Sequence, residues 1–385
     1  MSEALSDVVT IFDGPHATPE RKAEGKYFLN IACLNDGRLD LAAADRVSED
    51  DFRVWTRRVT PVAGDLLFSY ETRLGEAALM PEGVDACLGR RMALLRPKPG
   101  RVHPRFLLYY FLSPRFQRLI EINTIHGATV NRIGLASMGQ WPVEFPKMEN
   151  QRAIAEVLGA LDDKIAANQQ VSTVTERLSV ALVPTKGELV TVRSVAEHVR
   201  KQIEPSLMAA RVDHFSLPAF DERKLPQRTD SSTIKSAKFV LDSPAVLVSK
   251  LNPRFPRVWD VLPSQKVSAV ASTEFVVLEP REISTGLLAT LLSQPHLGVR
   301  LEGMAAGTSG SHQRVKPAEI LSLMVPDPAL MTPGLKDQVS RLRTIARKAR
   351  EESAQLAALR DSLLPALMSG KLRVRDAEKT VEEVL

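Results

Sequence analysis

The sequence predicts an α+β protein with two similar mixed α/β domains separated by two long helices packed as an antiparallel coiled coil. Two observations support this fold class. Apolar motifs of the first part of the chain recur about 180 residues later, and a long helix with heptad spacing follows each copy. A repeat of this length is much longer than a solenoid unit, so each copy is a domain in itself. At 385 residues and 44% hydrophobic content, the chain is long enough for two cores.

The internal repeat is carried by five pairs of short motifs. Their order is the same in both copies, which favours a duplicated domain over chance similarity. The pairs are residues 66–69 and 246–249, 94–97 and 277–280, 107–108 and 287–288, 127–132 and 307–314, and 145–146 and 325–326.

The first domain is expected to span residues 1–147. Short apolar runs bounded by glycine and proline are typical of buried strands. The clearest helix starts at Pro104, which suits a first helical position, and presents an apolar face to about residue 120. A polar loop follows at 124–132. The expected strands are residues 8–12, 27–32, 66–70 and 92–95.

The first spacer helix is expected at residues 148–183. Its apolar residues step by four and three along a coiled-coil seam, and Asn168 falls on the same seam. Three further residues, Val171, Val174 and Leu178, are expected to extend the apolar face. Packing of this seam against a domain is the alternative to helix pairing. The seam residues are Ile154, Leu158, Leu161 and Ile165.

The second half repeats this order. A second domain is expected at residues 184–332, with strand, strand and helix slots at 239–251, 275–278 and 287–292. A second spacer helix at 333–370 is expected to be interrupted by Pro365, and residues 371–385 form a charged, frayed tail. The seam of this helix carries Leu335, Val339, Leu342, Leu356 and Leu363.

Composition narrows the classes of function. The net charge of +5 permits nucleic acid as a partner without requiring it, and 5% aromatic content disfavours a stacking platform for single strands. Cys33 and Cys87 have no metal-ligand spacing and are expected to be buried free thiols in a reducing cytoplasm. Neither a signal peptide nor a membrane span is expected.

No motif for catalysis stands out in the sequence. The phosphate-binding GxxxxGK[ST], GxGxxG, HExxH and GxSxG patterns are missing, as are paired Cys/His zinc ligands. We therefore expect no catalytic residue, no metal ligand and no cofactor in this chain. An enzyme with an unrecognised site remains an alternative, which a nuclease or methyltransferase assay on the isolated chain would reveal.

Basic and polar loops at corresponding places in both copies are the remaining candidates for function. Arg and Lys suit guanine edges and phosphates, Asn and Gln suit adenine, and hydroxyl groups serve bases or backbone. For any one residue, a solvated surface loop is the alternative. The candidates for DNA binding are Tyr70, Thr72, Arg73, Arg90, Arg91, His126, Thr129, Asn131 and Arg132 in the first copy, and Lys250, Asn252, Arg254, Arg257, Ser311, Gln313 and Arg314 in the second.

Two similar domains, each followed by a long helix, would suit a DNA target with two separated half-sites. Helices of about 30 residues would be about 45 Å long. One turn of B-DNA is about 34–36 Å. An antiparallel helix pair is thus a plausible ruler between two reading domains.

With these motifs, the chain resembles the specificity subunit of type I restriction-modification systems over nearly its whole length. In the second copy, residues 307–314 and 331–336 depart from the pattern of the first copy. The resembling stretches are DGPHATP, GDLLFSYETRLGEAALMPEG, CLGRRMALLRP, TIHGATVNRI and NQRAIAEVLGALDDKIAANQQ in the first copy, and VLVSKLNPRFPRVWDV, STEFVVLEP and LRDSLLPALMSGKLRV in the second.

The resemblance implies two target recognition domains, each reading one half of a split sequence in double-stranded DNA. It also implies that the spacers bind two methyltransferase subunits, joined by restriction and motor subunits. S-adenosylmethionine, ATP and magnesium would then belong to these partners. The alternatives are a coiled-coil adaptor that binds methyltransferase subunits but no specific DNA, and a specificity component of a related phage-defence system.

Overall fold

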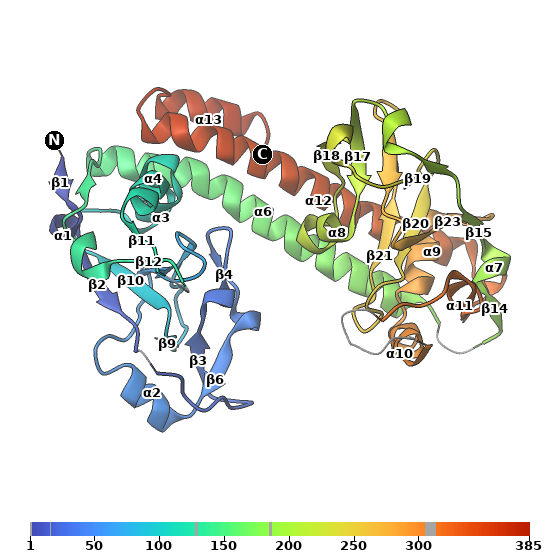
Figure 1. Ribbon diagram of the computed structural model, residues 1–385, viewed down its shortest axis with the longest axis horizontal. Coiled ribbons are helices and arrows are strands. Elements are labelled where there is room, and N and C mark those ends of the chain that lie inside the picture. Colours follow the sequence, from blue (N-terminus) through green and yellow to red (C-terminus); the bar gives the residue numbers. More distant parts are fainter. Residues whose placement is uncertain (1, 16, 128–129, 185–186, 305–312) are drawn as a thin grey trace. The chain divides into compact units, whose positions relative to one another are not determined.

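The computed structural model describes residues 2–385 except 16, 128–129, 185–186 and 305–312 (Figure 1). The chain divides into two compact units. Unit 1 comprises Met1–Lys164 and Leu356–Leu385, and unit 2 comprises Ile165–Gln355. Each unit therefore contains one mixed α/β domain and a part of each long helix.

Unit 1 is built on a four-stranded antiparallel sheet, in the order β2-β10-β7-β8. The central strand β7 is fully buried, as its sequence Leu-Leu-Phe-Ser predicts. In a smaller sheet, β3 pairs antiparallel with β6 and parallel with β9. The strands are β2 (Val9–Asp13), β3 (Lys26–Leu29), β6 (Asp45–Val47), β7 (Leu66–Ser69), β8 (Ala77–Leu79), β9 (Ala86–Leu88) and β10 (Met92–Pro97).

Unit 2 repeats this topology. Its antiparallel sheet has the order β15-β23-β20-β21, and in its second sheet β17 pairs antiparallel with β18 and parallel with β22. The predicted duplication of the domain is thus confirmed at the level of strand order. The strands are β15 (Ala196–Val199), β16 (Gln202–Ile203), β17 (Arg211–Phe215), β18 (Gln227–Asp230), β19 (Lys238–Val240), β20 (Ala245–Ser249), β21 (Val258–Val261), β22 (Ala269–Ala271) and β23 (Phe275–Pro280).

Shorter elements complete both units, and several of them correspond. In each unit a strand at the start of the domain pairs antiparallel with a strand at its end, β1 with β13 and β14 with β24. These elements are β1 (Glu3–Ala4), α1 (Leu5–Val8), β4 (Leu34–Asn35), β5 (Arg38–Leu39), α2 (Glu49–Trp55), β11 (Thr124–Ile125), β12 (Arg132–Ile133), α5 (Leu135–Met138), β13 (Pro142–Val143), β14 (Leu189–Thr191), α7 (Val192–Val195), α8 (Leu217–Arg223), α10 (Pro295–Met304), α11 (Pro317–Leu321) and β24 (Met324–Pro326).

The helix expected at 104–120 is two helices, α3 (Pro104–Leu112) and α4 (Pro114–Ile122). The expectation was wrong because Pro114 pushes the preceding residue out of the helical region, and Ser113 has an extended backbone with ψ 149°. The hydroxyl of Ser113 then caps α4 by accepting from the amide of Phe116. In unit 2, α9 (Thr285–Leu292) and α10 take the places of α3 and α4.

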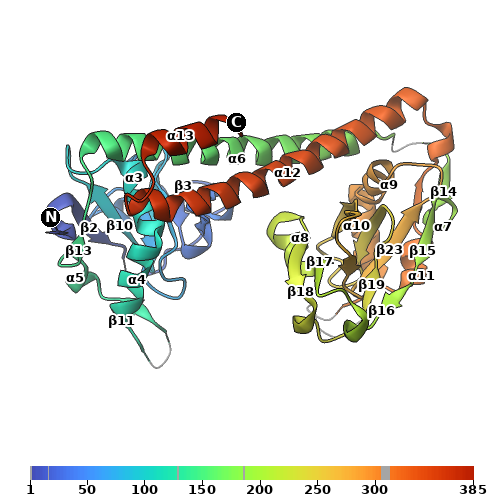
Figure 2. The ribbon, with the colours of Figure 1, turned by 90° about the horizontal axis from the view of Figure 1, so that it is seen from above.

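The two long helices are α6 (Met148–Leu182) and α12 (Pro333–Met368) (Figure 2). In unit 2, residues further along α6 meet residues further back on α12: Asn168 contacts Glu352, whereas Glu176 contacts Arg350 and Arg343. The helices therefore run antiparallel there. In unit 1, Arg360 of α12 pairs with Asp162 of α6 at 2.8 Å. The predicted antiparallel pairing is confirmed.

The predicted seam is buried in most places. On α6, Leu158 and Leu161 are fully buried, and Ile154 and Ile165 are 4% and 6% exposed. On α12 the seam is less complete, because two of its five residues are only half-buried. Val339, Leu356 and Leu363 are buried, whereas Leu335 and Leu342 are half-buried.

The expected extension of the apolar face beyond Ile165 is wrong. Val171, Val174 and Leu178 are 41%, 53% and 44% exposed. The buried side of this part of α6 carries Asn168, Ser172 and Ser179 instead. Charged residues of α12 supply the hydrogen-bond partners of Asn168 and Ser172, whereas Ser179 donates to the carbonyl of Glu176 and accepts from Thr290. This inward polar face leaves an exposed apolar stripe on α6.

We predict that Leu158→Ala lowers the free energy of unfolding of unit 1 by about 2–5 kcal/mol, since truncating a fully buried leucine loses its burial and leaves a cavity. Val174→Ala, on the exposed stripe, should change stability by less than about 0.5 kcal/mol. Native-state hydrogen exchange of peptides from residues 148–164 would measure the first effect. Equal losses of stability in both variants would contradict the burial of the seam residue Leu158.

The C-terminal part of the chain is more ordered than expected. The helix α12 continues through Pro365 to Met368, and Gly370, with a φ of +69°, follows its end. The segment expected to be a frayed tail forms α13 (Val374–Glu382). Ala377 and Val381, four residues apart, share one helical face and are buried.

Candidate nucleic-acid interface

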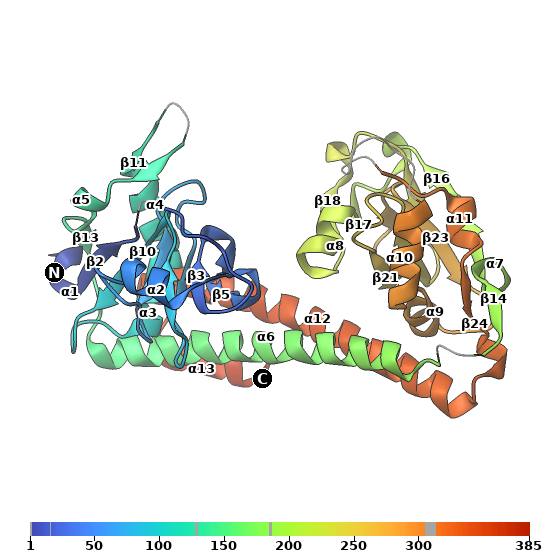
Figure 3. The same cartoon turned by 90° about the horizontal axis from the view of Figure 1, so that it is seen from below.

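In unit 1, three loops meet at the end of the buried strand β7. The backbone amide of Tyr70 donates to the carbonyl of Arg91 at 3.2 Å, and its carbonyl accepts from the amide of Ile133 at 2.8 Å. An isolated β-bridge joins Glu71 to Arg132. The loops at 70–75 and 89–91 and the described residues of 126–131 are thus held together through backbone contacts, and we call their side chains the loop surface of unit 1. The strands β11 and β12 form the hairpin that carries the third loop (Figure 3).

Among the described candidates of this unit, Tyr70 alone lies in the core. Its side chain is 4% exposed, and its hydroxyl donates to the backbone carbonyl of Arg90 at 2.9 Å. Burial raises the pKa of this phenol. The structure therefore places Tyr70 as a support for the loop at 89–91, with no free edge for a base.

The other candidates of unit 1 lie at the surface. The imidazole of His126 is 3.3 Å from the side-chain oxygen of Asn131 across the hairpin. Arg91 is 3.6 Å from Glu71, while Arg73 donates to the carbonyl of Ile31 and pairs with Glu76. Thr72, Arg90, His126, Asn131 and Arg132 are exposed, Arg73 and Arg91 are half-buried, and Thr129 lies outside the described residues.

Unit 2 builds a corresponding surface at the end of β20. The amide of Lys250 donates to the carbonyl of Glu274 at 2.8 Å, and its carbonyl accepts from the amide of Val315 at 3.0 Å. An isolated β-bridge joins Leu251 to Arg314. These contacts repeat those of Tyr70, Glu71 and Arg132.

Two details extend the equivalence to single residues. The hydroxyl of Ser69 donates to the carbonyl of Glu71 at 2.7 Å, and that of Ser249 donates to the carbonyl of Leu251 at 3.0 Å. The next residue in each loop has a left-handed backbone, with φ of +68° at Thr72 and +53° at Asn252. The two units therefore present polar side chains from the same backbone geometry.

The basic residues of unit 2 are held differently from one another. Arg257 makes two hydrogen bonds to Asp221, at 2.6 and 2.8 Å, and Arg314 makes two to Glu274, at 3.1 and 3.2 Å. The guanidinium of Arg254 lies 5.8 Å from the ring centre of its neighbour Phe255. Arg254 and Arg314 are exposed, Lys250, Asn252, Arg257 and Gln313 are half-buried, and Ser311 lies outside the described residues.

Acidic residues that orient these arginines were not predicted from the sequence. Glu71 holds Arg91, and Glu274 raises the pKa of Arg314 by accepting its hydrogen bonds. A carboxylate in a surface that binds a polyanion is unfavourable by itself, but it fixes the direction in which the guanidinium points. No local pattern signals this role, because Glu274 and Arg314 are 40 residues apart.

The left-handed residue at position 72 is strained, because a β-branched side chain is disfavoured at positive φ. We predict that Thr72→Gly raises the free energy of unfolding by about 1 kcal/mol while weakening DNA binding, so that stability and binding change in opposite directions. Thr10→Gly, in the extended strand β2, should lower stability instead. Thermal unfolding and binding assays on the same preparations test this, and a less stable Thr72→Gly variant would contradict the strain.

Cys33 and Cys87 are buried free thiols, as expected, and burial raises the pKa of Cys87 to about 12. The described part of the chain contains no cluster of three or more histidine, cysteine or acidic residues arranged to hold a metal ion. None of the described helices has the length and apolar character needed to cross a membrane.

Comparisons with known proteins agree with this arrangement. Residues 4–177 match the family model described as the type I restriction modification DNA specificity domain. A relative from Methanocaldococcus jannaschii, named as the specificity subunit of the type I restriction enzyme MjaX, is 24% identical over 181 residues. The match covers 45% of this chain and 42% of the relative, so this chain spans about two fifths of that protein's length.

A solved structure has the same fold over almost the whole chain. It is the S subunit of a type I restriction-modification system from M. genitalium, with a TM-score of 0.56 and 14% identity over 95% of both chains. This likeness supports the two-domain fold, and the family match covers the surface of the first unit. Residues 4–177 thus match the DNA specificity domain of type I restriction-modification systems, as the resemblance of the sequence predicts.

Proposed function

We propose that the chain is the sequence-specific DNA-binding subunit of a type I restriction-modification complex. In this proposal the loops of each unit read one half of a bipartite target in double-stranded DNA, and the chain itself catalyses no reaction. The observation that carries the proposal is the repeated loop surface, with the same backbone contacts in both units and a left-handed residue at its centre. Two equivalent reading surfaces suit two half-sites.

The chemistry of the loops supports base reading in the major groove. Exposed arginines can donate two hydrogen bonds to guanine, and the amide of an asparagine can pair with adenine. Other arginines and lysines would contact phosphates and fix the register on the duplex. Adenine methylation, ATP hydrolysis and cleavage would belong to two methyltransferase subunits and to restriction subunits, which bring S-adenosylmethionine, ATP and magnesium. The helix pair would set the gap between the half-sites.

Mapping of N6-methyladenine in DNA from cells that carry the intact system tests this function. We expect methylation within a split motif whose two halves are separated by a fixed gap. Deletion of this chain alone should abolish the methylation while leaving the partner subunits expressed. Methylation within a continuous motif, or methylation that persists after the deletion, would contradict the proposal. A coiled-coil adaptor would assemble with methyltransferase subunits but leave no footprint on DNA.

A further inference from the structure

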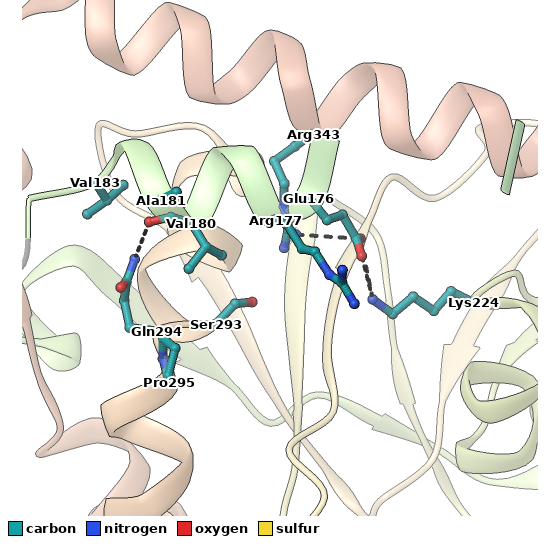
Figure 4. A pocket seen from close by; sticks show the side chains of 10 residues that line it. All are labelled: Glu176, Arg177, Val180, Ala181, Val183, Lys224, Ser293, Gln294, Pro295 and Arg343. Carbon is teal, nitrogen blue, oxygen red and sulfur yellow. Dashed lines mark hydrogen bonds and ion pairs between the residues drawn. The ribbon is translucent and has the colours of Figure 1, made fainter. Parts of the chain in front are cut away.

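A pocket of about 590 Å³ lies within unit 2 (Figure 4), and none of its lining residues belongs to the loop surface. Its volume is in the range of small-molecule sites, about 300–1,000 Å³. The walls come from the C-terminal part of α6, the end of α8, the start of α10 and α12. The lining residues are Glu176, Arg177, Val180, Ala181, Val183, Lys224, Ser293, Gln294, Pro295 and Arg343.

One side of the pocket carries an excess of positive charge. Glu176 is the sole acidic residue of the lining, and it faces Lys224 at 3.1 Å and Arg343 at 3.5 Å. Arg350, behind the lining, approaches the same carboxylate at 2.9 Å. Arg177 adds a further guanidinium at the exposed rim. Glu176 therefore faces three cations, with Arg177 beside them, and Asp260 is the second carboxylate that acts electrostatically on Arg343. The cations still outnumber the carboxylates.

The buried cations are incompletely satisfied. Arg343 is 4% exposed, and its Nε has no hydrogen-bond acceptor among the described residues. The Nε of Arg350 is likewise buried without an acceptor. Burial lowers the pKa of Lys224 and of Arg343 in spite of the nearby Glu176. Since an uncompensated buried charge is costly, this site favours a second negative charge.

The opposite wall of the pocket is apolar. Val180, Val183 and Pro295 line it, and the side chain of Gln294 is already used, since its Nε2 donates to the carbonyl of Val180 at 3.2 Å. Figure 4 shows these residues grouped beside the chain turn between α9 and α10, with Glu176, Arg177, Lys224 and Arg343 at the other end. A ligand that fills the pocket would thus combine a charged group with an apolar part.

We propose that this pocket binds a small organic anion. Its phosphate or carboxylate group would lie among Arg177, Lys224 and Arg343, and its apolar part would lie on Val180, Val183 and Pro295. Guanidinium groups donate paired hydrogen bonds to both kinds of oxyanion. This site is separate from DNA reading, and it stands or fails independently of that function.

Thermal unfolding of the full chain with inorganic phosphate, at constant ionic strength balanced with chloride, tests the site. Phosphate at about one hundred times its Kd should raise the Tm of unit 2 by roughly 5–10 °C. Arg343→Met should abolish this rise without lowering the Tm in phosphate-free buffer, because it removes the unsatisfied buried cation. Arg300→Gln, at an exposed position of α10 outside the pocket lining, is the matched control and should retain the full rise.

A comparison of four anions identifies the ligand chemistry, and a second variant at an exposed position tests the site even if Arg343→Met misfolds. Phosphate and acetate are compared to show which head group is preferred. Adenosine monophosphate and octanoate carry the same two head groups on an apolar body. The ligand with the preferred head group and an apolar body should bind at least about tenfold more tightly than the head group alone. The exposed Arg177→Gln should weaken binding about tenfold and remain folded. Equal stabilisation of the wild type and both pocket variants, or no Arg343-dependent binding of any of the four anions, would overturn the proposal.

Discussion

Replacing Glu176 with glutamine should lower the free energy of unfolding of unit 2 by about 3–5 kcal/mol, the largest loss that we expect from a single charge-removing substitution. The reason is the arrangement around its carboxylate. Lys224, Arg343 and Arg350 all approach it, and Arg343 is almost fully buried. Without the carboxylate these cations would repel one another in a partly buried site, where the side chain of Lys224 is only 27% exposed.

Acid should have the same effect as this substitution. Burial alone would raise the pKa of Glu176, but Lys224, Arg350 and Arg343 together lower it from 4.5 to about 2. A carboxyl whose pKa is lower in the folded state contributes stability above its unfolded value, and this stability is lost as the pH falls from about 4.5 to 2. The shift corresponds to about 3 kcal/mol. The variant should therefore lose much less stability than the wild type over this range.

The measurement can be confined to unit 2. Trp259 is the only tryptophan between residues 165 and 355, so that a Trp55→Phe, Trp141→Phe background leaves its fluorescence as the reporter of urea unfolding. Glu302→Gln, at an exposed position of α10 in the same unit, is the control and should change stability by less than about 0.5 kcal/mol. Similar losses for Glu176→Gln and Glu302→Gln would show that the cations do not depend on the carboxylate.

The helix α6, which carries Glu176, shows how far the sequence can predict the fold. The heptad steps from Ile154 to Ile165 predict a buried seam correctly, because apolar spacing reports directly on burial. Beyond Ile165 the same kind of reasoning chose Val171 and Val174, which are exposed. The inward face there is polar, and its burial depends on charged partners on α12, more than 160 positions later in the chain. Spacing alone cannot reveal partners at that distance.

The duplicated loop surface was predictable in position and only partly in detail. Motif recurrence placed the loops at 70–75 and 250–257 correctly, because each follows a buried strand that the sequence identifies. Tyr70 was chosen for its residue type, but it lies in the core and its hydroxyl supports a backbone carbonyl. The shared left-handed geometry is signalled only weakly by the sequence, since asparagine is among the residues that adopt positive φ at position 252, whereas threonine at position 72 rarely does.

Arg132 and Arg314 offer the sharpest test of two separate reading surfaces. They occupy equivalent bridged positions, and both are exposed. In the complex with methyltransferase subunits that the proposed function implies, we expect Arg132→Ala and Arg314→Ala each to weaken binding of the full target about 10- to 100-fold. Each variant should also tolerate base changes in one half-site only, and the two variants should differ in which half that is.

The pattern across mutated targets separates base reading from phosphate contact. If an arginine contacts a base, its loss removes the penalty for changing that base pair and leaves the other half-site as selective as before. If it contacts a phosphate, its loss weakens binding evenly across sequences. The slope of log K against the logarithm of the salt concentration then falls in magnitude by about one. Arg375→Ala, at an exposed position of α13, should change neither quantity. Loss of selectivity at the same half-site in both variants would contradict the equivalence of the two units, because one surface would then carry the whole readout.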